Sequence, residues 1–291
     1  MTSAAPPRRP YRVILASIAL EPNRWTGRRN PRYTLQELMP LAGQKGFDKL
    51  EIWQWHISNP YLEEAREIRK QADRLGLSFP YIGVYPRFHL QGPEAREEAR
   101  LQDDILDKAE ILGTPTLKVM LAAGLKGSNA TAEQLSLVAE RFGAWYQNAR
   151  SRGIGMVAEL HAGTLFDPPD VGIAFLNRFP DFDVGICFQP YDFTDLDGAL
   201  ALAKRFKGQI RHIHLQAPQK DSKGYARLAE SPLDYRHLLP AILRDNPGAT
   251  MTLEFVKGCV QEDGPFTLAH VLTNAQRDAE FVESVLAASP S

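Results

Sequence analysis

Cysteine is scarce in this sequence. The 291 residues include only two cysteines, Cys187 and Cys259, which lie in unrelated segments without CxxC spacing. This pattern excludes a thiolate zinc cluster and a disulfide scaffold, because both need several cysteines at short or recurring intervals. Reduced thiols are typical of a reducing compartment, so we predict a cytoplasmic protein.

An excess of charge of one sign and long hydrophobic runs are also lacking. The formal net charge is −1, and Lys and Arg are interspersed among Asp and Glu. No cationic stripe is therefore available for a phosphate backbone or an anionic membrane. The apolar run at residues 13–20 is far too short to cross a bilayer. We predict neither nucleic acid nor membrane as a partner, and we expect a buried first strand behind a flexible leader, residues 1–10.

The sequence does contain an alternation of short apolar, β-rich runs with longer segments of helical period. This alternation is typical of repeated βα units around a parallel sheet. Eight units can be counted, so we predict an α/β fold, a single (β/α)8 TIM barrel that forms one domain, residues 1–291. The predicted strands are residues 13–19, 49–53, 79–84, 116–121, 155–160, 184–188, 210–215 and 250–255.

Helix-start signals fall between these strands. Residues 34–37 (TLQE) and 131–134 (TAEQ) are capping boxes, and Asn59-Pro60 predicts a cap followed by proline at the first helical position. Further helices are predicted at residues 94–112, 169–179, 195–205, 234–244 and 267–288. A doubly wound open sheet is the alternative architecture. It would normally have a glycine-rich turn after the first strand, and residues 18–24 contain no glycine.

Polar residues occur at the predicted carboxyl ends of the strands, where barrels of this kind place their active sites. Glu159 and Glu254 are the clearest examples, because a carboxylate buried in an apolar strand needs a cation, hydrogen bonds or a function. One alternative is that each pairs with an interior Lys or Arg. Their occurrence with His214 on three strands that end at one face favours a functional site.

Two histidines lie two residues apart in the seventh predicted strand. We expect only one ring, that of His214, to face the barrel interior, and we expect His212 to be a packing residue directed toward the helices. His56 and the pair Trp53 and Trp55 at the second strand predict a sugar-binding wall, because the C–H faces of a pyranose pack on aromatic rings.

Several short motifs follow one another along the chain in a defined order. They are GFDKLEIW at residues 46–53, ELH at 159–161, GTL at 163–165, VGICFQP at 184–190, HIHL at 212–215, LDY at 233–235 and LEF at 253–255. In these motifs the chain resembles the xylose isomerase-like TIM barrels, which include sugar isomerases, ketose 3-epimerases, inosose dehydratases and apurinic-site endonucleases. The resemblance covers nearly the whole chain.

This resemblance implies a divalent metal ion, either Mn²⁺, Mg²⁺, Co²⁺ or Zn²⁺. The family's ligands are a Glu, an Asp, a His and a Glu at strands five to eight, which correspond to Glu159, Gln189, His214 and Glu254. Gln189 departs from the pattern, because glutamine supplies an amide oxygen but no charge. We therefore expect weaker or more selective metal binding, and loss of the metal is the alternative.

The resemblance also implies roles in catalysis and substrate binding. Glu159 and Glu254 would exchange protons at a carbon next to a carbonyl of a small carbohydrate. Substrate contacts are expected from Glu51, Trp53, His56, Lys118 and His161. Lys118 has an alternative role, the neutralisation of Glu51 or Glu159.

Four functions remain open at this point. The first is a metal-dependent isomerase or epimerase of a small sugar, keto-sugar or polyol, and the second is a lyase that acts on a keto-sugar or keto-glycoside. A non-catalytic sugar-binding or partner subunit is a third possibility because of Gln189. An endonuclease is disfavoured by the neutral charge and by the presence of only seven histidines. Family members often associate, so a homo-oligomer is one expectation.

Overall fold

The structure is a computed structural model that describes residues 10–24, 30–58, 61–192, 194–220, 224–260 and 265–288. The predicted leader lies outside these residues except for Pro10, and so do Asn59 and Pro60, which were predicted to begin the second helix. The helix that follows them begins at Leu62, with Tyr61 as its N-cap.

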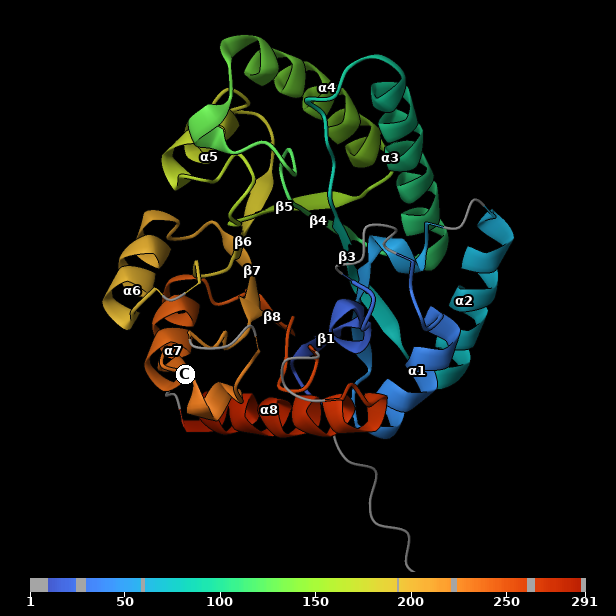
Figure 1. The fold of residues 1–291 in the computed structure, drawn as a ribbon, viewed down its shortest axis with the longest axis vertical. Helices are drawn as coiled ribbons and strands as arrows, with labels where there is room; N and C mark the ends of the chain where they lie inside the picture. Colours follow the sequence, from blue (N-terminus) through green and yellow to red (C-terminus); the bar gives the residue numbers. More distant parts are fainter. Residues whose placement is uncertain are drawn as a thin grey trace, which may run out of the picture.

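Eight parallel strands pair in sequence order and close into a barrel. Figure 1 shows the strands in the middle of the molecule and the helices in a ring around them. The (β/α)8 barrel is therefore confirmed, and the open sheet is excluded. The strands are Ile14–Ala16 (β1), Lys49–Trp53 (β2), Ser78–Val84 (β3), Thr116–Val119 (β4), Gly155–Glu159 (β5), Val184–Phe188 (β6), Ile210–Leu215 (β7) and Thr250–Leu253 (β8).

The strand ends differ from the prediction where the chain turns early. After β1 the residues Ser17–Leu20 form a 3-10 turn instead of continuing the strand. β8 ends at Leu253, so Glu254 is the first residue beyond it. The Glu254 amide still donates to Leu215 O at 3.1 Å, and this bond holds Glu254 beside the end of β7.

The helices follow the predicted pattern of caps. Thr34 and Thr131 both form complete capping boxes, and Asp195 and Asp234 accept backbone N–H groups at two further helix starts. The helices are Leu35–Gln44 (α1), Leu62–Leu75 (α2), Gly92–Leu112 (α3), Ala132–Ser151 (α4), Pro169–Leu176 (α5), Leu196–Arg205 (α6), Tyr235–Asp245 (α7) and Leu268–Ala288 (α8). α5 is shorter than predicted because residues 177–179 continue in tight turns.

Two apolar clusters stabilise the barrel. The larger one includes residues of every strand together with residues of the surrounding helices. The smaller one consists of Ile14, Tyr81, Val157 and Cys187. The Tyr81 ring on β3 stacks on His212 of β7 at a centroid distance of 3.9 Å. Because β3 and β7 lie on opposite sides of the barrel, this stacking places the smaller cluster in the barrel interior.

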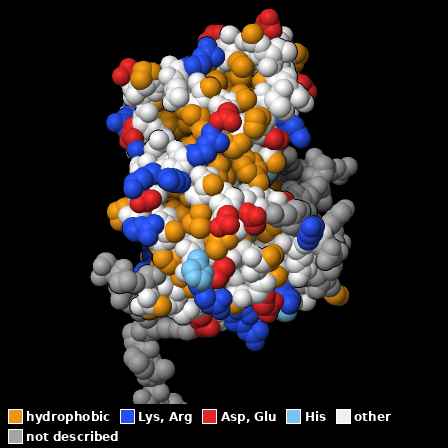
Figure 2. Space-filling view, turned by 90° about the vertical axis from the view of Figure 1, so that its left-hand side faces the viewer, with side chains coloured by type: hydrophobic (Ala, Val, Ile, Leu, Met, Phe, Trp, Pro, Cys, Tyr) orange, Lys and Arg blue, Asp and Glu red, His pale blue; other side chains and the backbone are white. Residues whose placement is uncertain are grey.

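The outer surface carries charges of both signs. On the face that Figure 2 shows, Lys and Arg alternate with Asp and Glu, and hydrophobic side chains gather between them. This face has no stripe of one charge. Within the described residues, no helix combines the length and the apolar character needed to cross a membrane.

Candidate functional site

A pocket of about 560 Å³ opens at the carboxyl ends of the strands. Residues at or just after the end of every strand contribute to it, as the barrel architecture predicts. The lining combines aromatic rings with polar groups, which is typical of sites for small ligands. Its residues include Ile18, Arg24, Trp53, Tyr85, Arg87, Met120, His161, Gln189, Asp192, Gln216, Tyr225, Glu254 and Phe255.

Three of the predicted metal ligands converge at this pocket. His214 Nδ1 lies 3.2 Å from Glu159 Oε1 and 3.3 Å from Glu254 Oε2. All three side chains are buried. The acids from β5 and from just beyond β8 therefore meet the imidazole of β7 within a few ångströms, and each offers one ligand atom to a common point.

The Gln189 carboxamide completes this cluster. One of its terminal atoms lies 2.9 Å from Glu159 Oε1, 2.9 Å from His214 Nδ1 and 3.0 Å from Glu254 Oε2, and the other lies 3.0 Å from Gln216 Nε2. If the inner atom is nitrogen, it donates to the two carboxylates. If the inner atom is oxygen, four electron-rich atoms face one another, and a cation among them is needed to stabilise the cluster.

Glu51 on β2 fixes the orientation of both histidines. His212 Nε2 lies 2.9 Å and His214 Nε2 lies 3.1 Å from its carboxylate. An ionised carboxylate only accepts hydrogen bonds, so both of these nitrogens carry the proton. Burial disfavours the charged form of Glu51, but the two imidazoles still hold the pKa of this carboxyl well below its usual range. Burial disfavours the charged form of His214, but the negative groups around the ring, Glu51 and Glu254 among them, hold the pKa of its imidazole well above its usual range. A metal ion bound at Nδ1 would replace the proton there, while Nε2 would keep its proton toward Glu51.

The prediction that His212 points toward the helices is wrong. Its ring lies in the barrel interior, where Nδ1 bonds Thr250 Oγ1 at 2.7 Å and Nε2 lies 3.1 Å from Thr252 Oγ1. The physical reason is the period of a strand, which sends residues two apart to the same face. His212 and His214 therefore lie on one side of β7, and His212 is held by hydrogen bonds beneath the site.

Lys118 on β4 pairs with Glu159, its Nζ lying 2.7 Å from Glu159 Oε2. The ammonium also lies over the Tyr85 ring, 5.3 Å from its centroid. Burial opposes both charges, but each group stabilises the other, so the pKa of Lys118 is well above and that of Glu159 well below its usual range. This contact agrees with the neutralising role considered for Lys118.

The donor set fits a divalent cation. Ligand atoms around an ion with bonds of about 2.0–2.2 Å lie about 2.8–3.1 Å apart at right angles and about 3.3–3.6 Å apart at the tetrahedral angle. Here the contacts of His214 and Gln189 with the other donors are 2.9–3.3 Å, and the donors of Glu159, His214 and Glu254 all lie within 4.8 Å of one another. The charges fit as well. The buried carboxylates of Glu51, Glu159 and Glu254 carry three negative charges, which one divalent ion and the Lys118 ammonium would cancel. Gln189 would thus ligate without adding a fourth negative charge.

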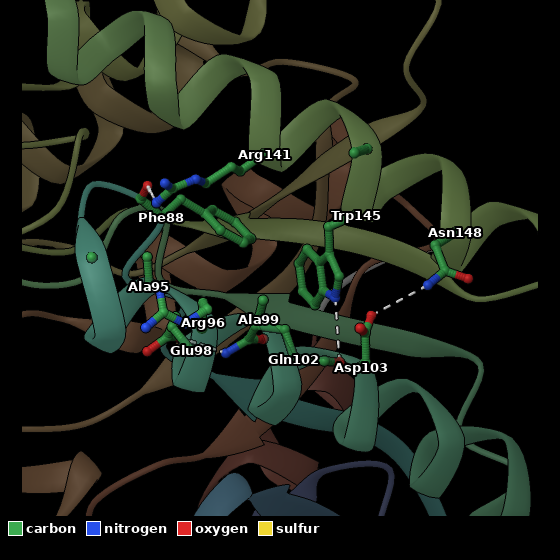
Figure 3. A pocket seen from close by; sticks show the side chains of 12 residues that line it. Phe88, Ala95, Arg96, Glu98, Ala99, Gln102, Asp103, Arg141, Trp145 and Asn148 are labelled. Carbon is green, nitrogen blue, oxygen red and sulfur yellow. Dashed lines mark hydrogen bonds between the residues drawn. The ribbon is translucent and has the colours of Figure 1, made fainter.

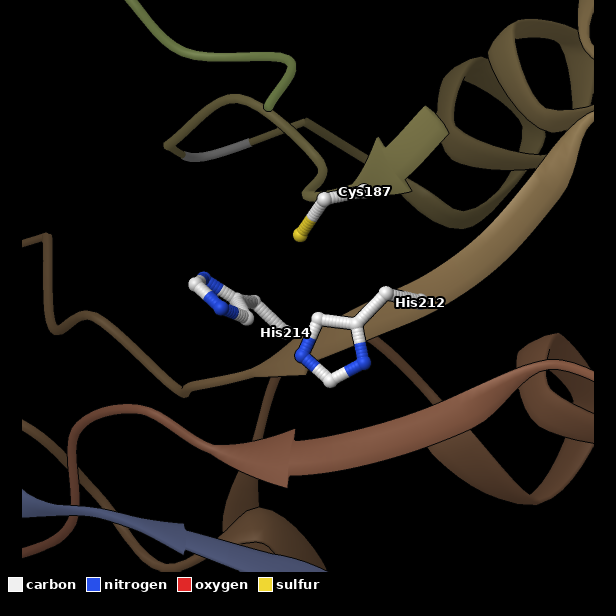
Figure 4. Close-up of side chains that lie close together, drawn as sticks. All are labelled: Cys187, His212 and His214. Atoms are coloured by element: carbon white, nitrogen blue, oxygen red, sulfur yellow. The ribbon is translucent and has the colours of Figure 1, made fainter. Parts of the chain in front are cut away.

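A second cluster, formed by Cys187, His212 and His214, lies deeper in the barrel (Figure 4). It is a poor metal site for two reasons. Both nitrogens of His212 already have hydrogen-bond partners. Burial also raises the pKa of the Cys187 thiol to about 11, and only the thiolate is an effective ligand.

The five predicted substrate contacts lie in different places. Trp53 and His161 line the pocket. Glu51, His56 and Lys118 are buried behind it and are not among the described residues that line it. His56 Nδ1 shares a hydrogen bond of 2.8 Å with Ser17 Oγ, and its Nε2 lies 3.7 Å from Glu21 Oε2.

Several lining residues were not identified from the sequence. Tyr85 and Arg87 follow β3, Gln216 follows β7, and Tyr225 lies in the loop beyond β7. The rule that strand ends carry the site would have found Tyr85, Arg87 and Gln216 if it had been applied to β3 and to the last residue of the seventh-strand segment. No sequence signal indicates Tyr225, because a long loop brings it to the pocket.

Comparison with known proteins agrees with this architecture. The family model for the xylose isomerase-like TIM barrel matches residues 40–284. No curated protein matches the chain. Among solved structures, a probable 3-DHS dehydratase from Bacillus anthracis is 13% identical with a TM-score of 0.69, covering 93% of this chain and 98% of its own.

Two other solved structures are similar to the same degree. D-psicose 3-epimerase with D-tagatose from Clostridium cellulolyticum H10 is 13% identical with a TM-score of 0.69, covering 94% of this chain and 98% of its own. A xylose isomerase-like TIM barrel protein from Mycobacterium smegmatis in complex with magnesium is 13% identical with a TM-score of 0.67, covering 95% and 98%. At this identity the structures support the fold alone, while the family match covers most of the sequence. The chain therefore belongs to the xylose isomerase-like TIM barrel family.

Proposed function

We propose that this protein is a divalent-metal-assisted isomerase or epimerase of a small sugar, keto-sugar or polyol. The observation that carries the proposal is the convergence of Glu159 Oε1, His214 Nδ1 and Glu254 Oε2 with the Gln189 carboxamide at a pocket lined by aromatic and polar groups. Aromatic rings such as Trp53 suit the C–H faces of a sugar, and polar side chains suit its hydroxyls.

Glu159, Gln189, His214 and Glu254 would hold the ion. A divalent cation there would stabilise the negative charge that develops on a substrate oxygen when a neighbouring carbon loses its proton. We also propose that the metal is manganese, that the protein is cytoplasmic and that it associates into a homo-oligomer. Both cysteines are buried thiols, which supports a reducing compartment.

The two candidate catalytic glutamates have different surroundings. Glu254 lines the pocket, so its carboxylate is placed to take a proton from a bound substrate. Glu159 is fully buried, and Lys118 occupies its second oxygen. A carboxylate held in the ionised form accepts a proton poorly. This difference favours a reaction that uses one base on one face of the substrate, such as isomerisation, over inversion at a carbon, which needs a second acid on the opposite face.

A lyase reaction is the second candidate. The probable 3-DHS dehydratase among the similar structures supports it. Loss of a proton next to a carbonyl is the common first step, after which the electron pair either returns to carbon with a proton or expels a substituent from the β position. The proton abstraction assigned to Glu254 is the same in both reactions.

Hydrogen exchange with solvent tests this proposal. Ketoses and 3-keto-glycosides are incubated with the protein and Mn²⁺ in D₂O, and deuterium at the carbon next to the carbonyl is followed by NMR. We expect exchange in the native protein and its loss in Glu254→Gln, whereas Glu140→Gln, which changes an exposed glutamate on α4, keeps it. Exchange without elimination supports the isomerase, and elimination supports the lyase. Absence of exchange with every substrate, together with no metal bound, favours the non-catalytic role.

A further inference from the structure

Arg87 lies at the mouth of the pocket, and among the described residues its guanidinium is bonded through Nε alone. It follows β3 by three residues and lines the pocket, and its side chain is 51% exposed. Its position after β3 lies across the barrel from the ends of β6 and β7. A guanidinium presents a planar, bidentate set of donors that matches a carboxylate or a phosphate.

A buried carboxylate on α3 holds this arginine in place. Glu98, whose side chain is 4% exposed, accepts from Arg87 N at 3.1 Å and from Arg87 Nε at 3.0 Å. Gln102 Nε2 donates to the same carboxylate at 2.8 Å. Figure 3 shows Glu98 and Gln102 together in the groove between α3 and α4. Within the guanidinium, Glu98 contacts only Nε of Arg87.

Two other basic groups near the pocket have protein partners. Arg24 donates through its two terminal nitrogens to Glu21 O and Cys259 O, and Lys118 pairs with Glu159. Within the part of the chain that the structure describes, no hydrogen bond or ion pair involves Arg87 Nη1 or Nη2. Those two nitrogens can therefore donate to a ligand without giving up a contact.

The acidic lining residues lie elsewhere around the mouth. Asp192 follows β6, so a negatively charged group would be repelled there and attracted toward β3. This asymmetry would orient a substrate with its reacting carbon at Glu254 and its charged end at Arg87.

We propose that Arg87, anchored by Glu98, binds an anionic substituent of the substrate, so that the site selects acidic sugar derivatives over neutral sugars. The shared chemistry is a carboxylate or a phosphate presented to the two Nη groups. The proposal deepens the proposed function and rests on it for the choice of a keto-sugar. Arg87 is a specificity-determining residue and Glu98 a positioning residue.

Equilibrium binding to the full-length protein with Mn²⁺ tests this inference. The probes are D-fructose, which is neutral, 5-keto-D-gluconate, which carries a carboxylate, and D-fructose 6-phosphate. Charge-assisted hydrogen bonds predict that at least one anionic probe binds about 10- to 100-fold more tightly than D-fructose. Which of the two is preferred distinguishes a carboxylate from a phosphate site.

Arg87→Gln is expected to abolish that preference, so that the anionic probes bind no more tightly than D-fructose. Arg96→Gln on α3 is the matched control, since it removes an exposed arginine that lies outside the pocket, and it should keep the preference. Glu98→Gln should reduce the preference partly, because Arg87 loses its charged anchor. No preference in the native protein, or a preference that survives Arg87→Gln, overturns the inference.

The failure of the proposed function gives a different result. If no probe exchanges hydrogen with solvent, the isomerase and lyase proposals fail. The role of Arg87 is then still tested by binding, through the preference for anionic probes and its loss in Arg87→Gln. If exchange occurs equally with neutral and anionic probes and Arg87→Gln has no effect on either binding or KM, the reaction stands and the assignment of Arg87 is wrong.

Discussion

Replacement of Gln189 by glutamate tests whether this position is adapted to a neutral ligand. The substitution keeps the size of the side chain and adds one charge. In the protein without metal the new carboxylate would lie 2.9 Å from Glu159 Oε1 and 3.0 Å from Glu254 Oε2. Three carboxylates would then share a site where the amide nitrogen can otherwise donate to two of them.

The expected cost follows from these distances. With an effective dielectric constant near 20, two like charges about 3 Å apart repel by about 5 kcal/mol. Uptake of a proton by one carboxyl relieves most of this repulsion, which leaves a net loss of about 2–4 kcal/mol at neutral pH. For a chain of this size such a loss lowers the Tm by roughly 3–7 °C. A divalent ion reverses the effect, because the added charge strengthens its binding, and a tenfold gain in affinity adds about 1.4 kcal/mol at a fixed excess of metal.

Thermal unfolding after chelation and with excess Mn²⁺ measures both effects. We expect Gln189→Glu to melt below the native protein without metal and to gain more from Mn²⁺ than the native protein does. Gln147→Glu, which adds the same charge at an exposed position on α4, should change neither value appreciably. Equal melting temperatures without metal, or an unchanged Mn²⁺ shift, would refute the argument that these groups surround a single cation position.

Three further substitutions test the supports of the site and of the fold. Lys118→Met should lower the free energy of unfolding in urea by about 3–5 kcal/mol, because Glu159 stays buried without the Lys118 ammonium. This loss of stability relative to the native protein should shrink as the pH falls toward about 4, because the Glu159 carboxyl of the variant is then protonated. Gly83→Ala should cost about 1–3 kcal/mol in the same assay and weaken Mn²⁺ binding, because its Cβ would lie 3.0 Å from Lys118 Cε. Thr34→Ala should cost about 1 kcal/mol through loss of the α1 capping box, with no change in Mn²⁺ binding; an effect on the metal would contradict a purely local role.

Most of the fold could be predicted from local signals in the sequence. Each strand is an apolar run covered on both faces, and Thr34 and Thr131 mark helix starts through hydrogen bonds within four residues. Such interactions depend little on the rest of the chain. The end of β1 at Ala16 was not predicted, because the turn that follows is held by contacts with distant segments, such as the hydrogen bond from Trp53 N to Ser17 Oγ.

The candidate site could be predicted only in part, because it depends on contacts between strands far apart in sequence. The meeting of Glu254 with Glu159 follows from strand order, although the eighth strand was predicted to include Glu254 and ends at Leu253. The role of Glu51 as the acceptor for two histidines could not be inferred, since it requires knowing that β2 faces β7 across the barrel. Arg87 is significant only because Glu98 approaches it from α3.

Anomalous diffraction from crystals grown with Mn²⁺ tests the central claim most directly. We expect one strong peak bonded to Glu159, His214 and Glu254, with the carboxamide oxygen of Gln189 as the fourth protein ligand. The contradicting result is a site without an anomalous peak at saturating Mn²⁺, in which the Gln189 amide nitrogen donates to both carboxylates.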